Sequence, residues 1–203
     1  MSRESQMESH KLAVKFFAQT GADIPVKDFV PVFHRWIQGK LVDGHQLIDV
    51  ADYSHVHQGP GTVLVSYEAN IHADLGDGKF GLLYIRKQPG AGSTFRERLR
   101  STFAYALKAA SMLEQDPALA GKLTFRTSDP VFLINDRLSA PNTPETFAQV
   151  RGELEAFLAG LYGTKVELSY SPHPERLFQV SIKAPHVAIN SLLEYGATAY
   201  MPN

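Results

Sequence analysis

Two glycine-containing turns divide the segment 47–87 into alternating strands, and this feature constrains the fold most strongly. Gln58-Gly59-Pro60-Gly61 interrupts a pattern of alternating apolar and polar residues, and Gly76-Asp77-Gly78 interrupts it again. In the first turn, proline supplies a fixed φ and the glycine after it tolerates a positive φ. In the second, Asp-Gly between alternating strands is a strong hairpin signal. The predicted consecutive antiparallel strands are 47–57, 62–75 and 79–87.

Two long helices are predicted from their capping residues and apolar spacing. Thr94 and Glu97 form a capping box ahead of a helix that runs to about residue 115. Thr143-Pro144-Glu145 begins a second helix, which ends at Gly163. Both segments repeat apolar residues at intervals of three and four, so each buries one face.

The rest of the chain supplies shorter elements. The segment 24–37 has helical spacing, but Pro31 lies inside the pattern and predicts a broken or late-starting helix. A short helix is predicted at 187–195. The remaining predicted strands are 11–18, 123–127, 131–134, 166–170 and 177–182.

These elements predict an α+β fold, with a mainly antiparallel sheet built from hairpins and two main helices packed on it. A chain of 203 residues is long enough to bury a substantial core. It has no linker-like stretch that would separate two domains. We predict a flexible N-terminal tail at 1–9 and a single α+β domain at 10–203.

Composition narrows the class of partner. The formal charge is −1 and the 20 basic residues are scattered, so we expect no nucleic acid. The chain contains no cysteine, which excludes disulfides, thiolate metal sites and cysteine nucleophiles. No run approaches the roughly 18 apolar residues of a membrane span, and the polar start has no secretory apolar region. A cytoplasmic location without membrane partners is the default expectation.

The polar side of the first hairpin carries the candidate catalytic residues. Strand alternation would place Tyr53, His55 and His57 on one side, with Glu68 on the return strand. Histidine titrates near neutral pH and serves as a general acid or base. His55 and His57 also have a spacing that can chelate a metal. Glu68, however, lies roughly 13 Å away at ~3.3 Å per residue. A third ligand would have to come from elsewhere, so we assign no metal site.

The same side of the hairpin is predicted to be partly covered. The Asp-Gly turn sets a register in which Leu83 and Ile85 lie opposite His72 and Asn70. A fully solvated surface would not carry leucine and isoleucine there. We expect either the helical segment 24–37 or a second subunit to cover it. The candidate ligand-binding residues are His34, Trp36, Gly59, Gly61 and Ser66.

Three interpretations of this surface remain open. The first is small-molecule binding, enzymatic or not, at the polar face of the 47–75 hairpin. The second is a non-catalytic interaction or homo-oligomerisation module that uses the same face or the 94–115 helix. The third is an ordinary solvated polar surface. The residue pattern indicates no particular cofactor, substrate or reaction.

Overall fold

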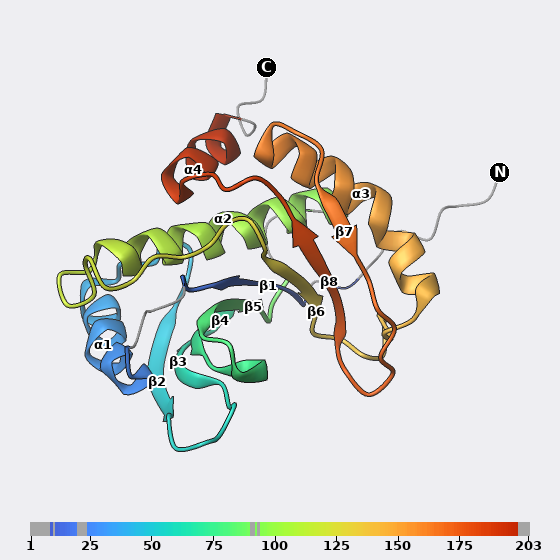
Figure 1. The fold of residues 1–203 in the computed structure, drawn as a ribbon. Helices are drawn as coiled ribbons and strands as arrows, with labels where there is room; N and C mark the ends of the chain where they lie inside the picture. The colour runs from blue at the N-terminus through green and yellow to red at the C-terminus, as the bar shows by residue number, and fades with distance from the viewer. Residues whose placement is uncertain (1–8, 10, 20–23, 90–91, 93, 199–203) are drawn as a thin grey trace.

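The computed structural model describes residues 9, 11–19, 24–89, 92 and 94–198. Their strands form one eight-stranded antiparallel sheet in the order β2-β3-β4-β5-β1-β6-β8-β7 (Figure 1). The predicted α+β class is therefore confirmed. The strands are β1 Leu12–Phe17, β2 Leu47–Tyr53, β3 Gly61–Ser66, β4 Ala69–Asp74, β5 Gly81–Arg86, β6 Val131–Ile134, β7 Glu167–Ser169 and β8 Phe178–Lys183.

Four helices lie on one side of this sheet, which curves beneath them (Figure 1). They are α1 Phe29–Gly39, α2 Phe95–Gln115, α3 Pro144–Tyr162 and α4 Ile189–Thr198, with short 3-10 turns η1 Val26–Asp28 and η2 Gly76–Gly78. The predicted capping box of Thr94 and Glu97 begins α2. Thr143 caps α3, and Gly163 ends it with a φ of 66°. Local signals thus fixed the ends of both long helices.

The first helix starts late, as Pro31 predicted. The chain makes the 3-10 turn η1 before α1 begins at Phe29, so Pro31 falls in the first turn of the helix. A proline there removes no helical hydrogen bond, because the first amides have no intrahelical acceptor. The helix then buries Phe33 and Trp36 against the sheet.

Alternation along β1 separates the two sides of the sheet. Leu12, Val14 and Phe16 are fully buried towards the helices, and the Phe16 ring meets Phe103 of α2 edge-on at 6.3 Å. Among the described residues, no helix covers the opposite side, which we call the open face (Figure 1). Its central residues are Ala13, Lys15, Val63, Val65, Asn70, His72, Asp74, Leu83 and Ile85.

The predicted return strand 62–75 is in fact two strands. The chain reverses at Tyr67-Glu68, between β3 and β4, without glycine or proline. The Ser66 hydroxyl donates to the carbonyl of Ala69 at 2.6 Å and accepts from its amide at 3.0 Å, which closes the turn. Because the strand is broken there, the residues after the turn lie on the opposite side of the sheet from the one that unbroken alternation would give them. Val63 and Val65 share the open face with Asn70 and His72, whereas alternation along one unbroken strand 62–75 would put them on opposite sides.

The register set by the second turn is as predicted. Asn70 pairs with Ile85, and His72 pairs with Leu83. Cover by the 24–37 segment is wrong, however, because α1 packs on the helical side of the sheet. There the Thr62 hydroxyl donates to the carbonyl of Val26 in η1. Within the described chain, Val65, Leu83 and Ile85 of the open face are left partly exposed.

Other boundaries needed smaller corrections. The predicted strand 123–127 reduces to a single bridge between Phe125 and Ala18. The last helix is α4, two residues later than predicted at its start. Of the predicted tail 1–9, only Ser9 is among the described residues, and it is buried. No helix in the described part of the chain is long and apolar enough to span a membrane.

Candidate functional site

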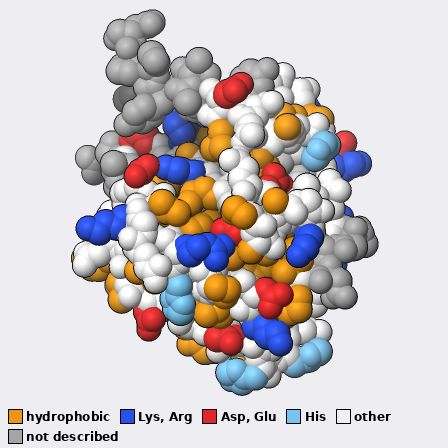
Figure 2. All heavy atoms as spheres, turned by 90° about the vertical axis from the view of Figure 1, so that its left-hand side faces the viewer, with side chains coloured by type: hydrophobic (Ala, Val, Ile, Leu, Met, Phe, Trp, Pro, Cys, Tyr) orange, Lys and Arg blue, Asp and Glu red, His pale blue; other side chains and the backbone are white. Residues whose placement is uncertain are grey.

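The two histidines of the predicted catalytic set lie in a loop. β2 ends at Tyr53, so His55 and His57 belong to the 54–60 connection and are exposed. The predicted strand to residue 57 is wrong, and alternation therefore does not align the two imidazoles. Tyr53 ends the edge strand and is 43% exposed. Figure 2 shows exposed histidine side chains at the lower end of this side of the molecule.

Four of the five predicted ligand-binding residues contribute to the core or to turns of the fold. Trp36 is 2% exposed within the core, and Ser66 closes the β3–β4 turn. Gly61 has the predicted positive φ, at 65°, and the buried Gly59 accepts a hydrogen bond from the Leu75 amide through its carbonyl. The fifth, His34, is exposed on α1. The structure does not gather these residues around one site.

Glu68 lies at the far end of β3 from the histidine loop. It sits in the β3–β4 turn, where its Oε2 accepts the Gln46 amide at 2.7 Å. The negative charge of Glu68 favours the protonated form of His45, a histidine that precedes β2, and so acts to raise its pKa against the larger effect of burial. The structure therefore separates Glu68 from His55 and His57, and brings it to a different group of residues on the helical side of the sheet.

That group is an aromatic cluster made of His45, Tyr84 and Tyr105. His45 Nε2 lies 3.0 Å from the Tyr84 hydroxyl, and the His45 and Tyr105 rings meet edge-on at 4.4 Å. Burial lowers the pKa of His45 and raises that of Tyr84 well above its usual value. Both groups are therefore neutral at pH 7. The Tyr84 hydroxyl donates to Nε2, and Nδ1 donates to the Asp43 carbonyl at 3.3 Å.

Within the aromatic cluster, the His45 ring and the Tyr84 hydroxyl already have hydrogen-bond partners. Arg86, which lies beside it, donates to the Ser101 hydroxyl at 2.9 Å and to the carbonyl of Gln88 at 3.2 Å. Glu68 is held by the Gln46 amide. Buried polar groups that are fully paired stabilise a fold and do not call for a ligand. We therefore read this cluster as structural.

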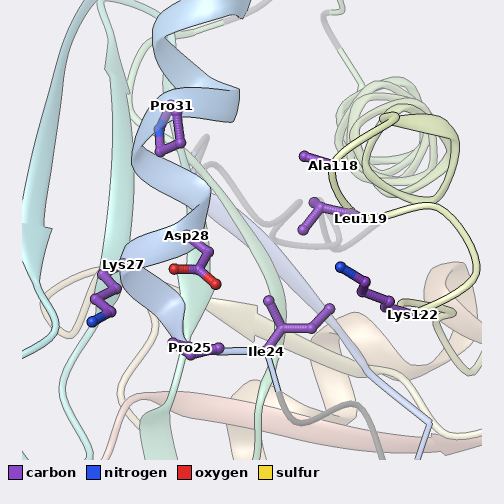
Figure 3. Close-up of a pocket in the computed structure, with 8 residues that line it drawn as sticks. All are labelled: Ile24, Pro25, Lys27, Asp28, Pro31, Ala118, Leu119 and Lys122. Carbon is purple, nitrogen blue, oxygen red and sulfur yellow. The ribbon is translucent and has the colours of Figure 1, made fainter.

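A cavity of about 440 Å³ opens between the start of α1 and the loop after α2 (Figure 3). Its lining is Ile24, Pro25, Lys27, Asp28, Pro31, Ala118, Leu119 and Lys122. Lys122 enters from the wall opposite Asp28 (Figure 3). None of these lining residues carries an imidazole, hydroxyl or amide side chain. The cavity thus offers three charged groups and apolar surface, and none of its lining residues has a buried polar side-chain atom without a partner.

The open face carries a buried ion pair. Lys15 Nζ lies 2.5 Å from Asp74 Oδ2, and both residues are less than 8% exposed. The same ammonium donates to the carbonyls of Gly76 at 3.0 Å and Lys79 at 2.8 Å. All three ammonium hydrogens therefore have acceptors. Asp74 Oδ2 also accepts the Gly76 amide at 3.0 Å, which ties β1 to the β4–β5 turn.

Beside this ion pair lie two polar side chains whose buried atoms have no partner, Asn70 and His72 of β4. His72 is 8% exposed, yet neither of its ring nitrogens makes a hydrogen bond with any described residue, and Asn70 Oδ1 is equally unpaired. Burial lowers the pKa of His72, against the opposing influence of Asp74 and the nearby Pro60 carbonyl. That carbonyl is near the ring but is not placed for a hydrogen bond. We call Asn70 and His72 the unpaired pair.

Apolar side chains flank the unpaired pair on both neighbouring strands. Leu83 and Ile85 lie directly opposite on β5, and Val63 and Val65 lie opposite on β3. All but the buried Val63 remain partly exposed. The open face therefore combines partly exposed apolar side chains, which we call the apolar strip, with buried hydrogen-bonding atoms that have no partner among the described residues. Small-molecule sites likewise combine apolar surface with a few polar groups.

Part of this site was visible in the sequence. Asn70, His72, Leu83 and Ile85 were placed on one side by the Asp-Gly register. The burial of the His72 ring could not be seen in the sequence. A single lysine within the apolar run of β1 is the signal that could have indicated the ion pair, but its partner is 59 positions away.

The two buried histidines predict opposite responses to substitution. His72→Leu removes an unpaired polar group, so we expect it to raise the free energy of unfolding by about 1 kcal/mol near pH 7.5. His45→Leu leaves the buried Tyr84 hydroxyl without its acceptor, so we expect this variant to lower the free energy of unfolding by about 1–3 kcal/mol. Urea denaturation of both variants measures this. A His72→Leu protein less stable than wild type would contradict the unpaired state of the ring.

The pH dependence of His72→Leu provides a further check. A histidine whose folded pKa lies below its unfolded value binds a proton more readily when unfolded. It therefore destabilises the fold as pH falls through about 6.5, by at most about 1.4 kcal/mol per pH unit. The wild type should lose stability between about pH 7 and 5 more steeply than His72→Leu. An unchanged slope would show that His72 keeps its ordinary pKa.

Among the described residues, no group of histidine and acidic side chains is arranged to hold a metal ion. No protein-family model, curated protein or solved structure matches the chain. The case for a function therefore rests on the chemistry of the open face.

Proposed function

We propose that the protein binds a small molecule on its open face, at the unpaired pair. One observation carries this proposal: on the open face, a histidine more than nine-tenths buried and a neighbouring asparagine oxygen both lack hydrogen-bond partners among the described residues. Leaving such a group unpaired costs about 1–3 kcal/mol. A ligand that supplies the missing partners offsets this cost.

The apolar strip supports the same proposal. Leu83 and Ile85 are partly exposed beside the unpaired pair, so a ligand would remove apolar area from water while it makes its hydrogen bonds. Hydrogen bonds made there would be shielded from competing water. We propose binding and not catalysis, because the nearest acid, Asp74, is already engaged by Lys15 and the Gly76 amide.

The alternative function, oligomerisation, has less support. The predicted interface helix α2 packs against α3 and α4, so much of its surface is used within the chain. The edge strand β2 is also partly blocked, because Asp49 Oδ1 accepts the Val50 amide at 2.8 Å and, just beyond the strand, Asp52 Oδ1 accepts the Ser54 amide at 2.8 Å. Acidic side chains that occupy edge amides oppose pairing with another strand.

A ligand-observed NMR screen with small fragments of mixed charge tests the proposal. We expect the wild type to give hits that are lost in Ile85→Arg, which places a long cation across the apolar strip. The hits should persist in the control Leu41→Arg, which alters an exposed leucine just beyond α1, on the other side of the sheet. If the Ile85→Arg protein does not unfold cooperatively, it is not properly folded, and the Val65→Arg variant is used in its place.

Two outcomes would contradict binding at the open face. One is a screen without hits. The other is a set of hits that survives both open-face variants, which would move binding to another surface, such as the cavity at α1. Hits should also raise the melting temperature of the wild type, because a ligand that binds only the folded state stabilises it.

A further inference from the structure

We infer that the ligand of the open face is neutral where it meets the unpaired pair, and presents a planar amide-like edge with one donor beside one acceptor. The inference rests on the proposed function and narrows it to a chemical class. Primary amides, lactams and the amide-like edges of heterocycles have this edge.

The charges around the unpaired pair argue against an ionic contact. The Lys15 ammonium has three acceptors and is neutralised by Asp74, so it offers no hydrogen to an anion. The other cation whose charge acts on His72 is Lys87, which follows β5 two residues beyond Ile85. Lys87 is partly exposed, so water already solvates its ammonium. An ion at the unpaired pair would exchange its hydration shell for neutral partners, which is unfavourable.

The hydrogen-bonding capacity of the unpaired pair matches an amide. With its pKa lowered by burial, the His72 ring is neutral, so one ring nitrogen carries a hydrogen and donates. The Asn70 Oδ1 atom accepts. The two residues stand on the same side of β4 two positions apart, roughly 7 Å between Cα atoms. A group with an N–H on one side and a carbonyl on the other satisfies both.

The apolar neighbours indicate that this group is attached to a flat hydrocarbon surface. Leu83 and Ile85 lie on one side of the unpaired pair, and Val63 and Val65 on the other. Aliphatic side chains in two parallel rows leave a strip that a planar ring can cover. An aromatic amide is therefore the simplest probe of the site.

Three benzene derivatives of the same size separate the possibilities: benzamide, benzoate and benzylammonium. Each is titrated into protein labelled at the leucine and isoleucine methyl groups, and the Leu83 and Ile85 methyl signals are followed by NMR. We expect benzamide to shift these signals saturably, and the two ions to bind at least about ten-fold more weakly. Asn70→Leu and His72→Leu should abolish this preference.

A matched control lies on the same side of the sheet. Gln179 of β8 is on the same rung as Asn70, four strands away, or roughly 19 Å at ~4.8 Å per strand. Gln179→Met should leave benzamide binding unchanged. A loss of binding in this variant would overturn the assignment to the unpaired pair.

The remaining outcomes separate the inference from the proposed function. Benzoate or benzylammonium binding at these methyl groups as tightly as benzamide would overturn the neutral ligand but support binding there. Benzamide binding that survives Asn70→Leu and His72→Leu would overturn the amide contact in the same way. No shift of either methyl group with any of the three probes would overturn both.

Discussion

Replacing Gly61 with alanine is expected to lower the free energy of unfolding by more than about 4 kcal/mol, enough to leave much of the protein unfolded. Gly61 begins β3 with a φ of 65°, a conformation that residues with a Cβ rarely adopt. A Cβ there would overlap the carbonyl oxygen of Ala73 on β4. The backbone of one strand would have to move, which disturbs the β3–β4 pairing next to His72. Chemical denaturation measures the loss.

Gly121→Ala isolates the contribution of the overlap. Gly121 also has a positive φ, at 74°, but a Cβ at this position would meet nothing within 4 Å. We expect this variant to lose only about 1–2 kcal/mol, the cost of the left-handed conformation. Equal losses in the two variants would contradict the close approach of β3 and β4 at Gly61.

The second large effect is expected from Lys15→Met. The substitution keeps the length of the side chain but leaves the Asp74 carboxylate buried without its cation. Removing one partner of a buried ion pair typically costs 3–5 kcal/mol, and we expect a loss of about this size. The double variant Lys15→Met with Asp74→Asn should be more stable than Lys15→Met alone, since it buries no unpaired charge. Denaturation of the single and double variants measures this coupling.

An exposed ion pair next to the open face serves as the control. Arg176 and Asp77 lie 3.3 Å apart, with 51% and 68% of their side chains exposed. Arg176→Met should change stability by less than about 1 kcal/mol, because solvent screens exposed pairs. If Lys15→Met proves as mild as Arg176→Met, the Lys15–Asp74 pair is not buried as described.

The sequence predicted the features that depend on a few neighbouring residues. The positive φ of Gly61, the capping box of Thr94 and Glu97, and the late start at Pro31 each follow from the chemistry of one turn of chain. The Asp-Gly turn likewise fixed the pairing of His72 with Leu83. Such signals are local, so the rest of the fold does not override them.

The site residues were predicted less well, because strand alternation fails when one turn is missed. The reversal at Tyr67-Glu68 depends on the Ser66 hydroxyl and carries no glycine or proline, so one strand was predicted where two form. A change of a single position moves every side chain to the other side of the sheet. His55 and His57 were aligned by a strand that ends before them, at Tyr53.

By itself, the sequence determined the α+β class, the hairpin construction of the sheet and the ends of the long helices. Only the tertiary structure decided that all four helices pack on one side, that Lys15 meets Asp74, and that Glu68 joins His45 instead of His55. It also decided that the His72 ring is buried without a hydrogen-bond partner in the part of the chain that the structure describes. These outcomes depend on contacts between distant segments, and burial and desolvation exist only once those segments have packed together.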